Sequence, residues 1–280
     1  MASSIFSASS AIGVQVRHGA SRFWVALKLL SEHGKLRRAA LIPTLLTLVG
    51  CLVFAYFDMD DDASDPSWRR FLAAFAALTA LPPTFLMPLW VKLALESRHV
   101  LTAAPGDSDI LNSSYFRMLK TEWMKVARQA FIVSIGVFPI LLLSKLLSLP
   151  DLIYQLAAGL WAFYWMVLDA IDLPLEVAPG KLGIASPSWF EQGFAAVKLG
   201  WFARAIARFA TPWRHAIHFT ERHPAATTGF AIAAGLCLLN PIIGVFFRSL
   251  ALVAATCLIV DDEQALAIER SLAANELPAG

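Results

Sequence analysis

Charged residues are scarce in this chain, and this scarcity limits the class of protein to which it can belong. Only 16% of the 280 residues are Asp, Glu, Lys or Arg, while 58% are hydrophobic; soluble domains carry about 25% charged residues. The formal net charge of +2 is too small to indicate nucleic acid or any strongly charged partner. The apolar residues also stand in long blocks, which is typical of an integral membrane protein whose partner is the lipid bilayer.

Cysteines are few, and the familiar catalytic motifs are missing. Cys51, Cys237 and Cys257 lie inside apolar blocks without ligand spacing, so we interpret them as small buried hydrophobes. The chain has no phosphate-binding loop, nucleophile elbow or zinc-protease motif. The sequence therefore predicts a protein that is not an enzyme and that binds no cofactor or metal. The N-terminus lacks the basic and apolar regions of a secretory signal.

Six apolar blocks predict an all-α membrane protein. Residues 39–57 and 71–91 approach the roughly 20 residues that a spanning helix needs, although Pro82, Pro83 and Pro88 interrupt the second block. The other blocks are residues 130–144, 152–168, 225–247 and 249–260. Twelve helical residues rise only about 18 Å, less than the hydrocarbon core. We expect two full transmembrane helices, followed by two helical hairpins that penetrate only partly.

Basic residues predict the orientation in the membrane. The segment before the first block contains Arg17, Arg22, Lys28, Lys35, Arg37 and Arg38, the next loop is rich in Asp, and the loop after it is basic again. Because cytoplasmic loops carry the excess of Lys and Arg, the first and third of these segments are expected inside the cell. With two returning hairpins, both termini and the region 181–222 are cytoplasmic as well.

Two stretches have the pattern of amphipathic interfacial helices. Phe23, Leu27 and Leu30 share one stripe of residues 17–36, and residues 189–209 combine aromatic and basic residues at helical spacing. Such helices suit the headgroup layer of a membrane. The alternative is that they are ordinary helices that pack on one another outside the membrane.

Arg37 and Arg38 are the candidate anion-binding residues. They stand beside Gly34 at the start of the first apolar helix, where free backbone N–H groups and two guanidinium groups suit an oxyanion. The alternative is a basic anchor of the kind that flanks most membrane helices.

Further polar residues are candidates for a transport path or for structural roles. Glu122 lies in a mixed-charge helix with Lys125 three residues on, Asp172 stands before Leu173-Pro174 at an expected helix end, and Asn240 precedes Pro241 inside an apolar block. Asp169 and Asp172 are the only candidate pair for a membrane enzyme. The histidines at 215, 218 and 223 match no metal-ligand spacing, and we interpret them as solvated or facing lipid headgroups.

Four segments carry a family resemblance. Residues 19–57 contain an amphipathic helix, the basic pair and a proline-containing apolar span; residues 117–143 contain Lys-Thr-Glu-Trp-Met-Lys; residues 161–175 hold an aromatic run that ends in Asp-Leu-Pro; and residues 229–261 contain Leu-Asn and Ala-Ala-Thr. In this order they resemble the bacterial CysZ sulfate permease family, which shares a domain with the eukaryotic etoposide-induced membrane proteins. Leu173 and Ala254 stand where that family has tyrosine and glycine.

The resemblance implies an oligomeric bacterial inner-membrane protein with two full transmembrane helices and two partly penetrating hairpins. It also implies that Arg37 and Arg38 bind sulfate. We expect a flexible N-terminal arm (1–18), a membrane domain (19–262) with an enlarged cytoplasmic helical loop (180–224), and a C-terminal tail (263–280). The expected function is passage of a small inorganic, sulfate-like oxyanion through a homo-oligomer. The alternative is a non-transporting membrane scaffold or regulator that recruits a partner through the loop 180–224.

Overall fold

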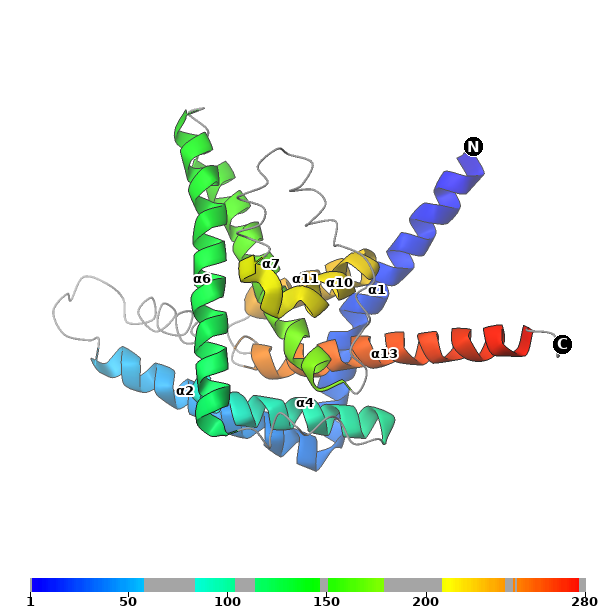
Figure 1. The fold of residues 1–280 in the computed structure, drawn as a ribbon, viewed down its shortest axis with the longest axis horizontal. Coiled ribbons are helices and arrows are strands. Elements are labelled where there is room, and N and C mark those ends of the chain that lie inside the picture. Colours follow the sequence, from blue (N-terminus) through cyan, green and yellow to red (C-terminus); the bar gives the residue numbers. More distant parts are fainter. Residues whose placement is uncertain are drawn as a thin grey trace.

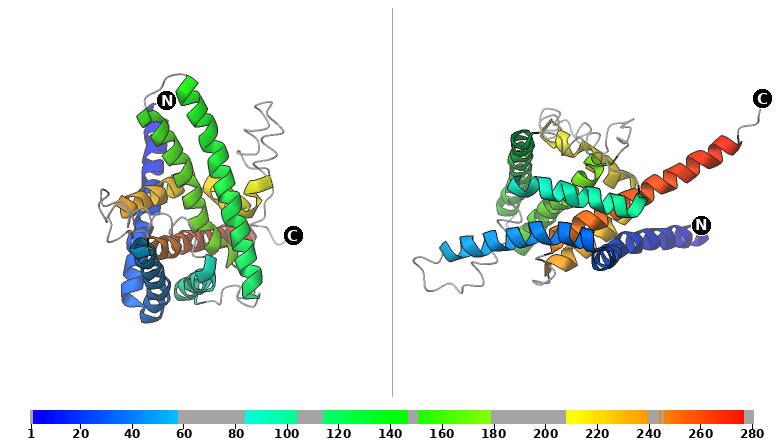
Figure 2. Two further views of the ribbon diagram at one scale, coloured as in Figure 1. Left: turned by 90° about the vertical axis from the view of Figure 1, so that its left-hand side faces the viewer. Right: turned by 90° about the horizontal axis from the view of Figure 1, so that it is seen from below.

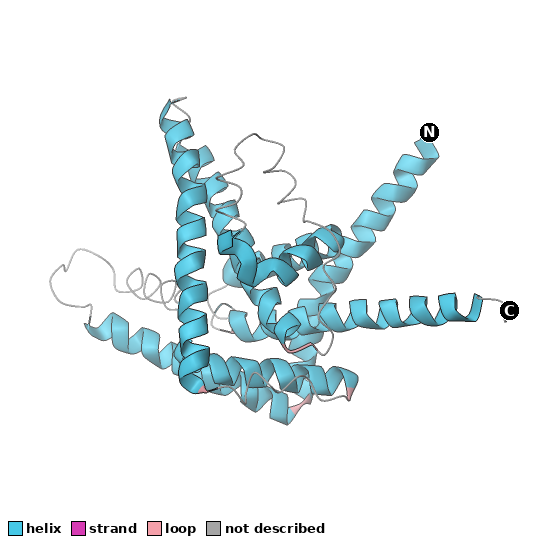
Figure 3. Cartoon of the chain, in the orientation of Figure 1, coloured by secondary structure: helices cyan, strands magenta, loops and turns pink. Residues whose placement is uncertain are grey.

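The described part of the chain is entirely helical. The computed structural model describes residues 2–57, 84–103, 114–146, 151–178, 208–239, 244 and 246–276. The long helices are α1 (Ala2–Glu32), α2 (Gly34–Phe57), α4 (Met87–Thr102), α6 (Tyr115–Leu146), α7 (Asp151–Glu176), α10 (Arg214–Arg222), α11 (Pro224–Leu239) and α13 (Phe247–Glu276). Two 3₁₀ turns, η1 (Thr84–Leu86) and η2 (Thr211–Trp213), precede α4 and α10. No strand occurs in these ranges (Figure 3), so the all-α prediction is confirmed.

Prolines begin two of these helices. Pro88 lies in the first turn of α4 and Pro224 is the first residue of α11, where the missing N–H would have no helical partner in any case. We had expected Pro88 to interrupt a membrane span. In the structure Pro88 instead stands near the start of a helix that ends at Thr102, with Ala103 in the left-handed conformation.

The first part of α13 is the centre of the fold. Every residue from 249 to 260 is buried, and α13 packs against α1, α4 and α7, with smaller contacts to α11 and α2 (Figure 1). We had paired residues 249–260 with residues 225–247 as a hairpin. The structure surrounds this short segment with other helices, because an apolar helix without a polar face buries most area at the middle of a bundle.

Helices α1 and α11 cross at two glycines. A Cβ atom on Gly19 would lie 1.8 Å from the carbonyl oxygen of Ala226, and one on Gly229 would lie 1.8 Å from the carbonyl oxygen of Val16. Only glycine permits backbones to approach this closely. Phe23 then packs on Phe230, with ring centroids 5.0 Å apart. Part of the apolar stripe that we had predicted on α1 therefore contacts protein.

A helix covers most of the N-terminal stretch. We had expected a flexible arm over residues 1–18, and α1 begins at Ala2. Nothing in this stretch stops a helix, since it contains no proline, and Gly13 is its only glycine. The predicted tail from residue 263 also begins inside a helix, because α13 continues to Glu276. Both helix ends project from the body (Figure 1).

Helices α6 and α7 lie side by side, as the hairpin prediction expected. Two further views show this pair running across the direction of α2 and α4 (Figure 2). We had expected α7 to end near Asp172-Leu173-Pro174, yet the helix includes Pro174 and reaches Glu176. The ionic contacts described below hold this last turn in place.

The region 180–224 is described only from residue 208 onward. Its described part packs on α7 through η2 and α10, and the fully buried Trp213 meets Trp165 edge to face with ring centroids 5.7 Å apart. Residues 208–222 are therefore part of the helical body. Most of the predicted interfacial stretch 189–209 lies outside the described residues.

Candidate functional site

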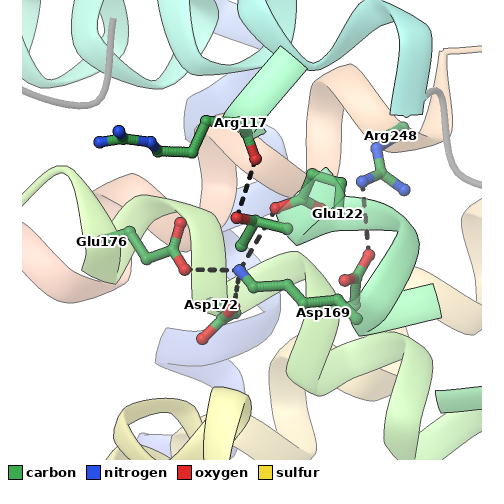
Figure 4. A network of polar contacts seen from close by, with 8 residues as sticks. Arg117, Glu122, Asp169, Asp172, Glu176 and Arg248 are labelled. Carbon is green, nitrogen blue, oxygen red and sulfur yellow. Dashed lines mark hydrogen bonds and ion pairs between the residues drawn. The ribbon is translucent and has the colours of Figure 1, made fainter. Parts of the chain in front are cut away.

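Three carboxylates converge on Lys125 between α6 and α7. Its Nζ lies 2.9 Å from Oδ2 of Asp172, 2.5 Å from Oε1 of Glu176 and 3.5 Å from Oε1 of Glu122 (Figure 4). Lys125 and Asp172 expose only 10% and 4% of their side chains. We call these four residues the Lys125 cluster.

Helix geometry explains how the cluster forms. Glu122 and Lys125 are three residues apart on α6, and Asp169, Asp172 and Glu176 follow at spacings of three and four on α7. Residues at these spacings share one face of a helix. Because α6 and α7 lie side by side, the acidic face of α7 meets the mixed face of α6.

A second ion pair links the Lys125 cluster to α13, and we call the cluster and this ion pair together the charged layer. Arg248 lies 3.3 Å from Oδ2 of Asp169, and its guanidinium stands 5.7 Å from the ring centroid of Trp90 on α4. Arg248 is the second residue of α13. The pair therefore joins the start of the buried α13 segment to α7, and the indole adds a cation–π contact.

The layer holds more negative than positive charge. Its carboxylates are Glu122, Asp169, Asp172 and Glu176 and its cations are Lys125 and Arg248, so four minus two leaves a formal excess of two negative charges. Burial lowers the pKa of Lys125, but the three nearby carboxylates outweigh this effect and raise its pKa well above the ordinary value. Burial raises the pKa of Glu122. Lys125 lowers this pKa without offsetting the effect of burial, and Glu176 and Asp169 raise it further.

A second charged cluster lies where α13 leaves the core. Asp261 contacts Arg22 at 2.8 Å and His18 at 3.3 Å, both on α1. Asp262 contacts His223 at 2.8 Å, between α10 and α11, and Glu263 contacts Arg98 of α4 at 2.5 Å. We call these seven residues the α13 clamp. Successive residues of a helix point about 100° apart, so three consecutive acids reach three different neighbours.

The predicted site residues are not all brought together. Glu122 and Asp172 meet at Lys125, whereas Arg37 and Arg38 are exposed on the first turns of α2. No ion pair joins either arginine to a described carboxylate. Asn240 lies outside the described residues.

Several charged residues of these clusters were missed from the sequence. Lys125 was considered only as a helical neighbour of Glu122, Arg98 only as part of the second basic loop, and Arg248 not at all. The available signal was the run Asp261-Asp262-Glu263 directly after twelve apolar residues. Such a run at the end of a buried helix needs cationic partners, although the sequence does not identify them.

One histidine has a partner that the sequence did not indicate. We had expected solvated or headgroup-facing side chains, and His223, whose side chain is 32% exposed, contacts Asp262. Across the described ranges, no group of three or more His, Cys, Asp or Glu residues is arranged to hold a metal ion.

One described helix has the length and composition to cross a membrane. It covers Ile153–Glu176, which is nearly all of α7. Our prediction for full spans had named residues 39–57 and 71–91 instead, and much of the second range lies outside the described residues. No family model matches the chain, and no curated protein is significantly similar to it.

Proposed function

We propose that this chain is a multi-pass helical membrane protein that passes a small inorganic, sulfate-like oxyanion across a bacterial inner membrane. The observation that supports membrane insertion best is an inverted distribution of side chains. Charged groups such as Lys125, Asp172 and Arg98 are buried, while large apolar side chains cover outer faces. Water favours the opposite arrangement, whereas a bilayer favours this one.

The exposed apolar side chains form continuous helix faces. On α2 they are Ile42, Leu45, Leu46, Val49, Leu52 and Val53; on α7 they are Ile153, Leu156 and Leu160; and on α11 they include Ile232 and Leu236. Their spacings of three and four place each set on one side of its helix. Acyl chains, or further copies of the chain in a homo-oligomer, would cover them.

Arg37 and Arg38 are the proposed anion-binding residues. Both are exposed, and they lie in the positive N-terminal part of α2, where guanidinium groups can donate two parallel hydrogen bonds to an oxyanion. In the orientation that we propose, with both termini cytoplasmic, this pair stands at the cytoplasmic mouth of the path.

The Lys125 cluster is assigned a structural role in this proposal. Its formal excess of negative charge would repel a sulfate-like anion, so the path does not include it. Glu122 and Asp172 instead hold α6 and α7 together. Of the two roles that the sequence left open for them, this proposal takes the structural one.

Flux in proteoliposomes tests the proposal. The wild type should carry radiolabelled sulfate, and the double variant Arg37→Ala/Arg38→Ala should lose most of the flux while inserting normally. Lys28→Ala is the matched control, because Lys28 is an exposed cation of α1 that pairs only with Glu32 in the described residues, and it should retain the flux. Equal flux in wild type and double variant would remove Arg37 and Arg38 as the site. If the wild type carries no sulfate, thiosulfate, phosphate or molybdate, the scaffold alternative is favoured.

A further inference from the structure

The α13 clamp ties three parts of the fold to one short stretch of helix. Asp261 holds α1, Asp262 holds the corner between α10 and α11, and Glu263 holds α4. The contacts lie directly after the buried residues 249–260. Any change in one pair therefore acts at the point where the central helix leaves the core.

The three pairs differ in the chemistry of their cations. Arg22 and Arg98 stay charged at every physiological pH, so the pairs with Asp261 and Glu263 always keep their cation. Histidine gains or loses its proton between about pH 5 and 8. Asp262 has His223 as its ionic partner within the described residues, and only 11% of its side chain is exposed.

His18 does not offer a second equivalent switch. It shares Asp261 with Arg22, lies farther from the carboxylate than Arg22 does, and is 41% exposed. Solvent screens such a contact. The charged residues that adjoin His223 along the chain are Glu221 and Arg222 on α10, and those that adjoin Asp262 are Asp261 and Glu263 on α13.

We propose that the His223–Asp262 pair is a proton-sensitive latch, which protonation of His223 tightens and deprotonation loosens. A protonated imidazole gives Asp262 a full counter-charge 2.8 Å from its Oδ1. A neutral imidazole leaves a nearly buried carboxylate without compensating charge, which disfavours the closed arrangement.

The position of the latch shows what its release would affect. His223 directly precedes α11, and α11 crosses α1 at Gly19 and Gly229. Helix α1 leads through His33 into α2, since the backbone N–H of Arg37 bonds to the carbonyl of His33. Loosening the α10–α11 corner at higher pH therefore loosens the support of the helix pair that carries Arg37 and Arg38. The inference does not depend on which species, if any, the protein transports.

Hydrogen–deuterium exchange of the full-length protein in nanodiscs tests the latch. Exchange is measured at about pH 5.5 and pH 8, corrected for the intrinsic pH dependence of amide exchange, over peptides that cover residues 219–227 and 258–265. The wild type should exchange several-fold more slowly at the lower pH in both regions. His223→Gln and Asp262→Asn should each abolish this difference, and combining them should add nothing.

The control is His33→Gln, since His33 is exposed between α1 and α2, and it should retain the wild-type pH difference. A pH difference that persists in His223→Gln or in Asp262→Asn overturns the proposal. So does a wild type whose corrected exchange is the same at both pH values. If His223→Gln does not fold, Asp262→Asn tests the same pair from the other side.

Discussion

Lys125 of α6 and Asp172 of α7 lie 2.9 Å apart, between Nζ and Oδ2, and so join two positions that are 47 residues apart in the chain. The pair is buried, and Glu122 and Glu176 are the other two carboxylates of the Lys125 cluster. A charge in such a place stays ionised only with its partners present, so removal of one partner leaves the others uncompensated.

Lys125→Met should therefore destabilise the protein strongly, by roughly 3–5 kcal/mol. Thermal unfolding in detergent, followed by tryptophan fluorescence, measures the loss. Lys28→Met is the control, because Lys28 is 66% exposed, and it should change stability by less than about 0.5 kcal/mol. Adding Asp172→Leu to Lys125→Met should restore part of the loss. A Lys125→Met protein that unfolds like the wild type would show that the cluster contributes no stability.

The raised pKa of Glu122 predicts that the free energy of unfolding depends on pH. Burial raises its pKa in the folded protein above the ordinary value of 4.5, so the folded state binds the proton more tightly than the unfolded state. The contribution of the protonated Glu122 carboxyl to the stability of the fold is fully present below pH 4.5. It is lost as the pH rises through the pKa that Glu122 has in the folded protein. Glu122→Gln should therefore gain in melting temperature relative to wild type as pH rises above 4.5, and the gain should become constant above the folded pKa. Melting curves at several pH values measure it, and a gain that shrinks with rising pH would contradict the sign.

The crossing of α1 and α11 predicts an unusual sensitivity to a single methyl group. Gly229→Ala would place Cβ 1.8 Å from the carbonyl oxygen of Val16, so the helices must separate, at a cost of about 1–3 kcal/mol or more. Gly159→Ala is the matched control, since a Cβ there meets nothing within 4 Å. It should stabilise α7 by roughly 0.5–1 kcal/mol. Equal melting temperatures for the two variants would mean that the crossing is not as close as described.

The exposed face of α7 predicts a test of membrane insertion. Leu160→Arg, at a position 69% exposed, should impair insertion by about 2.5–3.5 kcal/mol if this face meets acyl chains. Ile268→Arg is the control, because Ile268 is 61% exposed on the projecting part of α13, and it should insert normally. Carbonate-resistant membrane association measures both variants. Equal association of the two would indicate that Leu160 does not face lipid.

Hydropathy and helical spacing predicted much of the secondary structure. The apolar blocks 130–144 and 152–168 fall within α6 and α7, and residues 249–260 fall within α13. What this reasoning missed was the surroundings of the blocks. Residues 249–260 looked like one half of a shallow hairpin because periodicity reports whether a face is apolar and not whether lipid or protein covers it.

The candidate site was predicted only in parts. Glu122 and Asp172 were named from the sequence, one as a member of a helical pair and the other at a helix end, but nothing local indicated that both contact Lys125. The link from Arg98 to Glu263 joins positions 165 residues apart. Such contacts depend on which helices become neighbours, and local spacing carries no information on that choice.

By itself, the sequence determined that the described chain is helical, where most of its apolar segments lie and that charge is scarce, because these properties follow from residue type and from spacing along one helix. Only the tertiary structure decided that α13 lies at the centre, that Gly19 and Gly229 bring two backbones together, and that three consecutive acids contact α1, the corner between α10 and α11, and α4. The physical reason is that burial and ion pairing are properties of contacts between distant segments, whose partners exist only after the helices have packed.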